Sequence, residues 1–134
     1  MTERYTGRCL CGSIRYQCGP LLYPPTLCHC ESCRRASGAH ALGWCTVACR
    51  DLEFTQGRPV EFPSSPGRLR GFCGTCGSPL TYRSEARADE VDVTLGTLDA
   101  PGRVAPGDHI WMEDAVSWDR PQDGLPCYAR GRGA

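Results

Sequence analysis

The stretch Cys28-His29-Cys30-Glu31-Ser32-Cys33 places three thiols within six residues. Thiolates this close repel one another unless a cation lies between them, and zinc accepts such ligands at about 2.3 Å. In an extended segment the sulfurs of Cys28 and Cys30 point the same way, and the imidazole of His29 points the other way. A turn that begins at Glu31 then adds Cys33 as a third ligand. Three protein ligands leave one tetrahedral position open, which is typical of a catalytic zinc site.

Two further cysteine pairs have metal-ligand spacing. Cys9-Leu10-Cys11-Gly12 lies near the N-terminus, and Cys73-Gly74-Thr75-Cys76-Gly77 lies far downstream. Together they supply four thiolates, and a structural zinc bound there contributes about 10 kcal/mol to folding. We therefore expect two Zn²⁺ ions per chain. Cys9, Cys11, Cys73 and Cys76 would hold the structural ion, and Cys28, Cys30 and Cys33 would hold the catalytic ion.

Spacing alone leaves other pairings open. Cys9 and Cys11 could share an ion with Cys28 and Cys30, or the seven thiolates could form one cluster. Four of the eleven cysteines have no partner at ligand spacing, and we expect them to pack as small buried apolar side chains: Cys18, Cys45, Cys49 and Cys127. Cys45 could instead face the second ion, because it alternates with Trp44 along a predicted strand. The odd cysteine count and the Cys-x-Cys spacing argue against a disulfide framework.

Length and charge narrow the class of protein further. The chain has 134 residues, enough for one domain, and its fifteen basic and fifteen acidic residues balance. No basic stripe favours nucleic acid as a partner, and no apolar run approaches the roughly 18 residues that cross a bilayer. The first five residues contain no apolar leader segment, so we expect the cytoplasm. Nothing in the sequence indicates the oligomeric state.

Short apolar runs between scattered glycines and prolines predict an all-β domain, a small sandwich or open barrel. We expect strands at 13–17, 41–47, 52–55, 59–62, 69–72, 80–83, 91–95 and 109–112, with 52–55 and 59–62 paired as a hairpin. One short helix should begin at Glu31 and end at Gly38 in the C′ position. Residues 127–134 lack apolar content and are expected to form a flexible C-terminal tail.

The cysteine motifs also occur in a known order. The segments are Gly7-Arg8-Cys9-Leu10-Cys11-Gly12-Ser13-Ile14-Arg15-Tyr16, Cys28-His29-Cys30-Glu31-Ser32-Cys33-Arg34-Arg35 and Phe72-Cys73-Gly74-Thr75-Cys76-Gly77-Ser78, followed by His109-Ile110-Trp111 and Trp118-Asp119. They resemble the glutathione-dependent formaldehyde-activating enzyme (GFA) family, also called the centromere-protein-V (CENP-V) domain family, of which this chain looks like a short member. The resemblance implies a zinc-binding domain over residues 5–126 with the Mss4-like (β-tent) fold.

The resemblance also implies which cysteines share each ion, a question that spacing alone leaves open. Cys9, Cys11, Cys73 and Cys76 match the family's closed structural zinc, and Cys28, Cys30 and Cys33 match its catalytic zinc. The namesake activity is the condensation of formaldehyde with glutathione to S-hydroxymethylglutathione.

An open zinc position suits the capture of a thiol. A coordinated thiol is deprotonated, and its thiolate can attack an aldehyde carbon. We therefore expect a carbon–sulfur lyase-type enzyme whose partners are a glutathione-like thiol and a small carbonyl compound. Arg34 and Arg35 follow Cys33 and could bind a substrate carboxylate, although solvated positions on the helix are the plainer interpretation. His29 and His109 are expected to pack or to form hydrogen bonds, and His40 to lie at the surface.

A second hypothesis belongs to a different class of function. In a non-catalytic binding or interaction module with the same fold, both ions would only brace the chain. A fourth protein ligand at the second ion, from Cys45, His29 or a residue of the C-terminal strands, would favour this interpretation.

Overall fold

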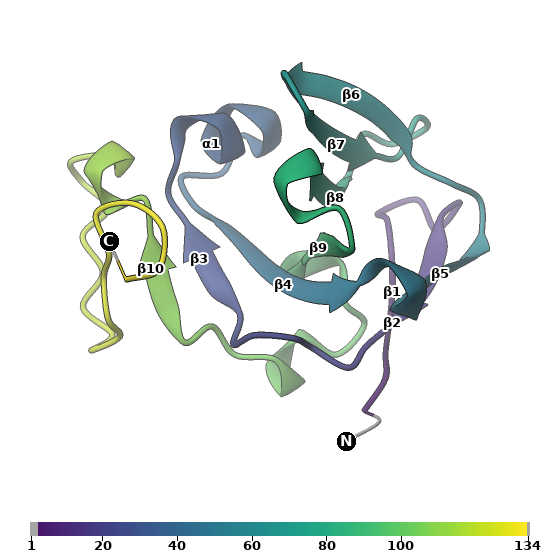
Figure 1. Cartoon of the computed structure of the whole chain (residues 1–134), viewed down its shortest axis with the longest axis horizontal. Coiled ribbons are helices and arrows are strands. Elements are labelled where there is room, and N and C mark those ends of the chain that lie inside the picture. Colours follow the sequence, from purple (N-terminus) through teal and green to yellow (C-terminus); the bar gives the residue numbers. More distant parts are fainter. Residues whose placement is uncertain (1–2, 134) are drawn as a thin grey trace.

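Short strands form two open sheets in this computed structural model, which describes residues 3–133 (Figure 1). The small sheet has the order β1-β2-β5 and the large sheet the order β10-β3-β4-β9-β8-β7-β6. All neighbours are antiparallel except β10 and β3. The strands are β1 (Tyr5–Arg8), β2 (Arg15–Cys18), β3 (Thr26–Cys28), β4 (Leu42–Ala48), β5 (Leu52–Gln56), β6 (Val60–Ser65), β7 (Arg68–Phe72), β8 (Pro79–Ser84), β9 (Glu90–Thr94) and β10 (Asp108–Ile110). The predicted mainly β class is confirmed, and neither sheet closes into a barrel.

Helical structure is confined to short segments. The helix α1 (Glu31–Ser37) ends at Gly38, whose φ of 75° and N–H bond to the Arg34 carbonyl (2.7 Å) form the expected cap. The helix is therefore confirmed with its predicted boundaries. Five single 3₁₀ turns occur elsewhere among the described residues: η1 (Cys49–Asp51), η2 (Glu85–Arg87), η3 (Leu95–Thr97), η4 (Pro101–Arg103) and η5 (Met112–Asp114).

Strand β4 supplies side chains to two separate cores. Successive residues of a strand point to opposite faces, so Cys45 and Val47 enter the main core while Trp44 faces the other way. The main core lies between the sheets and includes Tyr16 of β2 and Val93 of β9. Trp44 instead packs with Cys28 and Cys33 in a second, smaller cluster. The large sheet thus has one face that supports the fold and one that borders the three-cysteine segment.

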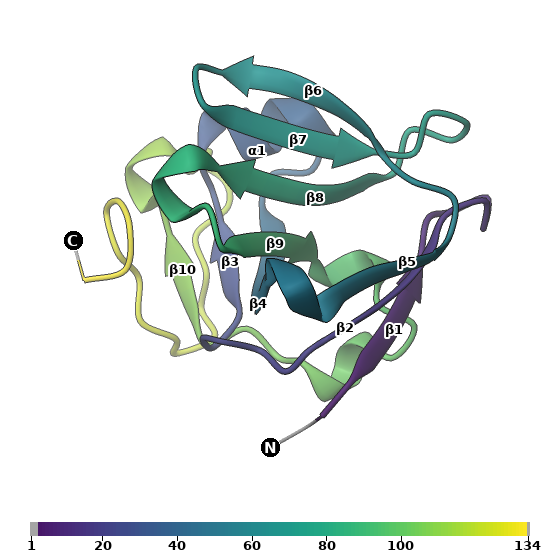
Figure 2. The ribbon, with the colours of Figure 1, turned by 45° about the vertical axis from the view of Figure 1, so that its right-hand side comes forward.

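The predicted hairpin of 52–55 with 59–62 is wrong. Phe54 of β5 pairs with Tyr16 in the small sheet, whereas Phe62 of β6 pairs with Arg70 in the large sheet. Figure 2 shows β6 at the edge of the large sheet beside β7, whereas β5 lies apart from it near β2. Both segments alternate in the same way, and alternation does not reveal which partner a strand selects. Strands β1 and β3 were not predicted, because neither segment shows the alternation of apolar and polar side chains that indicates a strand.

The segment 127–132 lies along β10 (Figure 1). The Tyr128 N–H donates to the His109 carbonyl, and the Trp111 N–H donates to the Arg130 carbonyl, each at 2.9 Å. The Arg132 guanidinium pairs with the Asp108 carboxylate at 2.6 Å. These bonds lie where the sequence predicts a flexible tail, because its composition does not reveal backbone pairing. The extent of the domain, residues 5–126, stays a prediction.

None of the helices between residues 3 and 133 combines the length and apolar character needed to traverse a bilayer.

Candidate functional site

The four-cysteine cluster connects the two sheets. Cys9 follows β1 of the small sheet, and Cys73 follows β7 of the large sheet. The Sγ atoms of Cys9, Cys11, Cys73 and Cys76 lie within 4.8 Å of one another, with Cys9–Cys11 at 3.6 Å and Cys11–Cys73 at 3.8 Å. Tetrahedral zinc–sulfur bonds of about 2.3 Å place sulfurs about 3.8 Å apart. These four donors therefore fit one metal ion with no open position.

Each half of this cluster is a tight turn closed in the same way. The Gly12 N–H donates to the Cys9 carbonyl (3.1 Å), and the Gly77 N–H donates to the Cys73 carbonyl (2.8 Å). Both glycines have positive φ, 81° and 82°, which glycine adopts without strain. The downstream turn also directs the Cys76 N–H at the Cys73 sulfur, at 3.4 Å. A hydrogen bond of this kind stabilises a thiolate.

Two serines stabilise the thiolate form of this cluster. The Ser78 hydroxyl lies 3.2 Å from the Cys76 sulfur, and this hydrogen bond is the largest cause that lowers the pKa of Cys76 to about 5. The Ser13 hydroxyl lies 3.3 Å from the Cys73 sulfur and is the main cause that lowers the pKa of Cys73 to about 7. Neither serine was predicted from the sequence, although each follows a Cys-Gly pair, a repeat that could have indicated them.

The three-cysteine cluster is built on β3 and α1. Cys28 ends β3, Cys30 precedes α1, and Cys33 lies in its first turn. Their sulfurs lie within 4.8 Å of one another, and the Cys33 N–H donates to the Cys30 sulfur at 3.3 Å. Side-chain hydrogen bonds from Cys28, then Cys33, lower the pKa of Cys30. The three donors fit a metal ion with one position left open.

No fourth cysteine, histidine or carboxylate within residues 3–133 joins this three-sulfur group. The two candidates from the sequence are directed elsewhere. Cys45 packs in the main core with Cys18, and the His29 Nε2 lies 2.9 Å from the His109 Nδ1. The seven thiols therefore form two groups, and the single cluster that spacing left open is not formed.

The remaining cysteines differ in exposure. Cys18 and Cys45 are buried as predicted, and burial raises the pKa of Cys18 to about 11 and that of Cys45 to about 12. Cys49 is half-buried, and Cys127 is exposed. The prediction of a buried Cys127 is therefore wrong, because its segment joins β10 through backbone hydrogen bonds instead of inserting side chains into a core.

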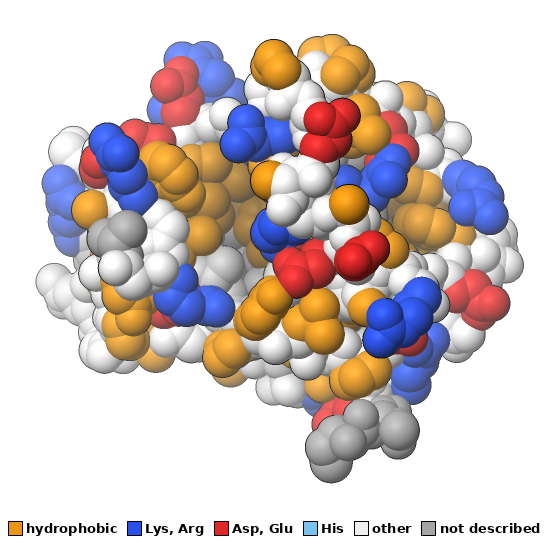
Figure 3. Space-filling view, in the orientation of Figure 1, with side chains coloured by type: hydrophobic (Ala, Val, Ile, Leu, Met, Phe, Trp, Pro, Cys, Tyr) orange, Lys and Arg blue, Asp and Glu red, His pale blue; other side chains and the backbone are white. Residues whose placement is uncertain are grey.

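A cavity of about 430 Å³ opens beside Cys30. Tyr82 and Trp111 supply aromatic walls, and Arg68 and Arg70 of β7 supply positive charge. Figure 3 shows a hollow lined by hydrophobic side chains in front of β3 and β4. Arg68, Arg70 and Tyr82 were not predicted from the sequence, because β7 and β8, which carry them, meet the cysteines only in the folded chain.

The arginines predicted for substrate binding lie elsewhere. Arg34 and Arg35 line a separate hollow with His40 and Trp118, and neither lines the cavity beside Cys30. Arg35 also forms an exposed ion pair with Glu31 at 2.8 Å. Their role in substrate binding stays a prediction, which this placement does not support.

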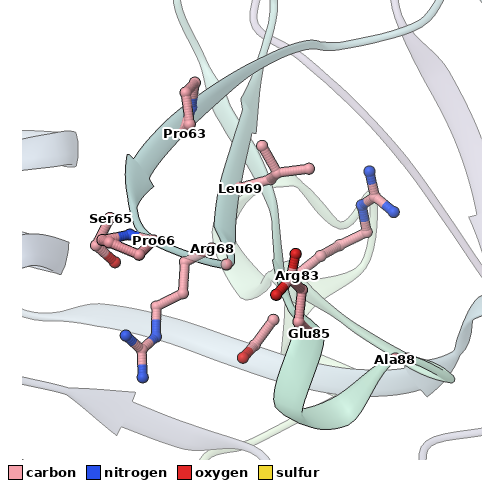
Figure 4. Close-up of a pocket in the computed structure, with 10 residues that line it drawn as sticks. Pro63, Ser65, Pro66, Arg68, Leu69, Arg83, Glu85 and Ala88 are labelled. Atoms are coloured by element: carbon pink, nitrogen blue, oxygen red, sulfur yellow. The ribbon is translucent and has the colours of Figure 1, made fainter.

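A larger cavity, of about 550 Å³, lies at the turn between β6 and β7 (Figure 4). Figure 4 shows Glu85 and Arg83 in this region, whereas the Arg68 side chain extends away from Arg83. The lining contains no cysteine or histidine. The candidate chemistry therefore belongs to the cavity beside Cys30.

His29 points away from the sulfurs, as its alternation predicts. It is 1% exposed, and burial lowers its pKa. The chain of hydrogen bonds continues from His109 Nε2 to the Asp123 carboxylate at 2.8 Å. These bonds connect the Cys28–Cys30 segment to β10 and to the C-terminal residues. His40 is exposed, as predicted, and lies 2.5 Å from the Asp119 carboxylate.

Comparisons with known proteins agree with this arrangement. The family model described as "Glutathione-dependent formaldehyde-activating enzyme" matches residues 4–114. A protein of Halomonas elongata named "Putative glutathione-dependent formaldehyde-activating enzyme" is 28% identical, over 92% of this chain and 85% of that protein. The crystal structure of a Rhodobacter sphaeroides protein has the same fold, with a TM-score of 0.59, 21% identity, and coverage of 92% of this chain and 98% of the other. Because the family model spans most of its length, the chain belongs to the glutathione-dependent formaldehyde-activating enzyme family.

Proposed function

We propose that this protein is a zinc-dependent carbon–sulfur lyase-type enzyme that acts on an adduct of a thiol with an aldehyde. The observation that carries the proposal is the three-sulfur cluster of Cys28, Cys30 and Cys33, which has no fourth protein donor among the described residues and borders a cavity. A site with three ligands accepts an outside molecule, whereas the four-sulfur cluster of Cys9, Cys11, Cys73 and Cys76 is complete by itself.

Cys28, Cys30 and Cys33 would hold the zinc ion, which would supply a Lewis-acid position that favours the deprotonated form of an entering thiol. The chain's own residues prepare the place where that thiol reacts. Tyr82 and Trp111 line the cavity, and Cys30 borders it. In the synthetic direction the substrate sulfur forms a bond to the aldehyde carbon, and the carbonyl oxygen takes up a proton. Lyase action reverses these changes and releases the thiol and the aldehyde.

Glutathione and formaldehyde are the first substrates to test, since the family is described by them. Exchange between free formaldehyde and its hydroxymethyl adduct is expected to be faster with the protein than without it, as followed by NMR. The cytoplasm, where glutathione is abundant, is the compartment we propose. No acceleration with glutathione or other small thiols would exclude this activity and favour the binding module, in which the ions only brace the fold.

Metal analysis tests whether the two cysteine clusters have separate catalytic and structural roles. Purified protein is expected to contain about two zinc ions per chain. Cys30→Ser should lose one ion and keep a native circular-dichroism spectrum, whereas Cys73→Ser should unfold the domain. Equal structural damage from the two substitutions would contradict separate catalytic and structural roles.

A further inference from the structure

Arg70 contacts the sulfur of Cys33 in the three-cysteine cluster, although Arg70 is not itself a candidate metal ligand. Its Nη1 and Nη2 atoms lie 3.7 and 3.8 Å from the Cys33 sulfur, so both arms of the guanidinium face one ligand. The Arg70 Cζ also lies 5.0 Å from the centroid of the Tyr82 ring, directly across the β7–β8 pairing. Residues opposite each other on adjacent strands share a face, so the Tyr82 ring holds the guanidinium against the cluster.

The charge of Arg70 has no carboxylate partner. Within residues 3–133 no Asp or Glu oxygen lies within 4.0 Å of this guanidinium, although several other arginines have such a partner. The Arg70 Nε is buried and has no hydrogen-bond acceptor. An ionised arginine needs acceptors for its N–H groups. The Cys33 sulfur is the acceptor that the structure provides.

The three sulfurs are shielded in different ways. Cys28 is 6% exposed and Cys33 is 4% exposed, while Cys30 is half-buried and borders the cavity. Cys30 accepts the Cys33 N–H, and Cys33 accepts the two arms of Arg70. Hydrogen bonds from a cation withdraw charge from a thiolate, and a thiolate with less available charge is a weaker nucleophile. These donors are already engaged with sulfurs of the cluster.

We propose that Arg70, which lines the cavity and donates to the buried Cys33 sulfur, is a positioning residue that shields this sulfur and keeps it unreactive, so that an electrophile in the cavity combines with the entering thiol and not with the cluster. The reaction that it suppresses is addition of the Cys33 sulfur to the aldehyde carbon, in which a carbon–sulfur bond forms and the carbonyl oxygen takes up a proton. That addition would convert a thiolate ligand into a weaker thioether ligand. The inference rests on the proposed function for the identity of the electrophile.

The test compares zinc-loaded wild type with Arg70→Met, Arg70→Lys and Arg68→Met. Arg68 is the matched control, because it lies two residues earlier on β7, lines the same cavity and makes no hydrogen bond to a cysteine sulfur. Iodoacetamide forms a carbon–sulfur bond with a reactive thiolate and releases iodide, and mass spectrometry then reports the modified cysteine. Loss of the two long hydrogen bonds from Arg70 predicts about tenfold faster modification of Cys33 in Arg70→Met. Arg70→Lys should fall between it and wild type, and Arg68→Met should match wild type.

A second measurement separates this inference from the proposed function. In the cobalt-substituted protein the sulfur-to-cobalt absorption band should shift in Arg70→Met and not in Arg68→Met. The role of Arg70 would be overturned if both Arg70 variants keep their metal and Cys33 is modified in them as slowly as in wild type. Should Arg70→Met not fold, the rate in Arg70→Lys decides the question alone. If added glutathione leaves the wild-type cobalt band unchanged, the proposed thiol capture is wrong. The role of Arg70 is then still decided by the modification rates of Cys33.

Discussion

At the scale of single residues, Ser13 and Ser78 brace the four-cysteine cluster across its two halves. Ser13 belongs to the N-terminal turn, yet its hydroxyl lies 3.3 Å from the Cys73 sulfur of the other turn. Ser78 belongs to the downstream turn, yet its hydroxyl accepts the Leu10 N–H at 2.9 Å. Each hydroxyl therefore contacts both halves, and loss of a group that orients metal ligands lowers metal affinity by about 10- to 100-fold.

Ser13→Ala is expected to lower metal affinity at the four-cysteine cluster about tenfold, because the Cys73 and Cys11 thiolates lose a hydrogen-bond donor. Competition with a chromophoric chelator measures this affinity. Ser84→Ala is the matched control, since its hydroxyl accepts only the Ala86 N–H at the start of η2. Equal affinity in wild type and Ser13→Ala would show that the hydroxyl has no part in holding the metal.

Cys45 tests the distinction between ligand and packing cysteines. Its sulfur is buried in the main core, where burial raises its pKa to about 12, so it remains a neutral thiol. Cys45→Ala should therefore retain both ions and lose about 1 kcal/mol of unfolding free energy from the small cavity that it leaves. Metal analysis and urea unfolding measure the two effects. Loss of an ion would identify Cys45 as a ligand.

At the scale of elements, the short-range features could be predicted and the pairing of strands could not. Helix α1 follows from a turn after Cys30 and a glycine at residue 38, and the cysteine turns follow from spacing. The partners of β5 and β6 depend on contacts distant in sequence, which alternation does not encode. For the same reason the three thiols could be identified from the sequence, whereas Arg70 and Tyr82, which reach them from β7 and β8, could not.

Gly38 ends helix α1, which carries Cys33 of the candidate site. Its φ of 75° is unfavourable for any residue with a Cβ, although a Cβ there would meet no atom within 4 Å. Gly38→Ala should therefore cost about 1 kcal/mol through backbone strain alone. This strain destabilises α1, which carries Cys33. The ion at Cys28, Cys30 and Cys33 should therefore be released faster, and the release rate of the other ion should not change.

The control for this variant is Gly96→Ala, since Gly96 also has open space around its Cβ position but no positive φ. It should leave both ions unchanged. Release kinetics with a chelator, resolved into two phases, provide the measurement. Acceleration of both phases in Gly38→Ala would mean that the strain spreads beyond α1.

At the scale of the whole molecule, the four-cysteine cluster and the C-terminal segment 127–132 hold distant parts of the chain together. Cys11 and Cys73 are 62 residues apart and bring the small and large sheets to one cluster. Metal binding that closes so long a loop contributes directly to folding free energy. The segment 127–132 acts at the opposite side, where it holds Trp111 of the cavity wall in a left-handed conformation with φ of 59°. A bulky residue rarely adopts this conformation unless its surroundings hold it there.

Asp108→Asn is expected to release the C-terminal segment. Burial acts to raise the pKa of the Asp108 carboxyl, but hydrogen bonds from Arg132 and Thr26 outweigh it and hold the pKa below the ordinary value of 3.8. A carboxyl whose pKa is lower in the folded state contributes its full stability above the ordinary value and loses it as the pH falls through the folded-state value. The carboxylate is thus fully charged at neutral pH, and the substitution should cost about 1–3 kcal/mol there.

The difference in melting temperature between wild type and Asp108→Asn should accordingly stay constant from about pH 5 to about pH 9. Hydrogen exchange should show faster exchange of the Tyr128 and Trp111 amides, which bond across the interface with β10. Asp123→Asn is the matched control, because its carboxylate accepts from the His109 Nε2 and the Leu125 N–H and not from Arg132. A difference that instead changes across this pH range would mean that another group titrates with the segment. Unchanged exchange of both amides would show that the segment stays bound without the ion pair, through its backbone hydrogen bonds alone.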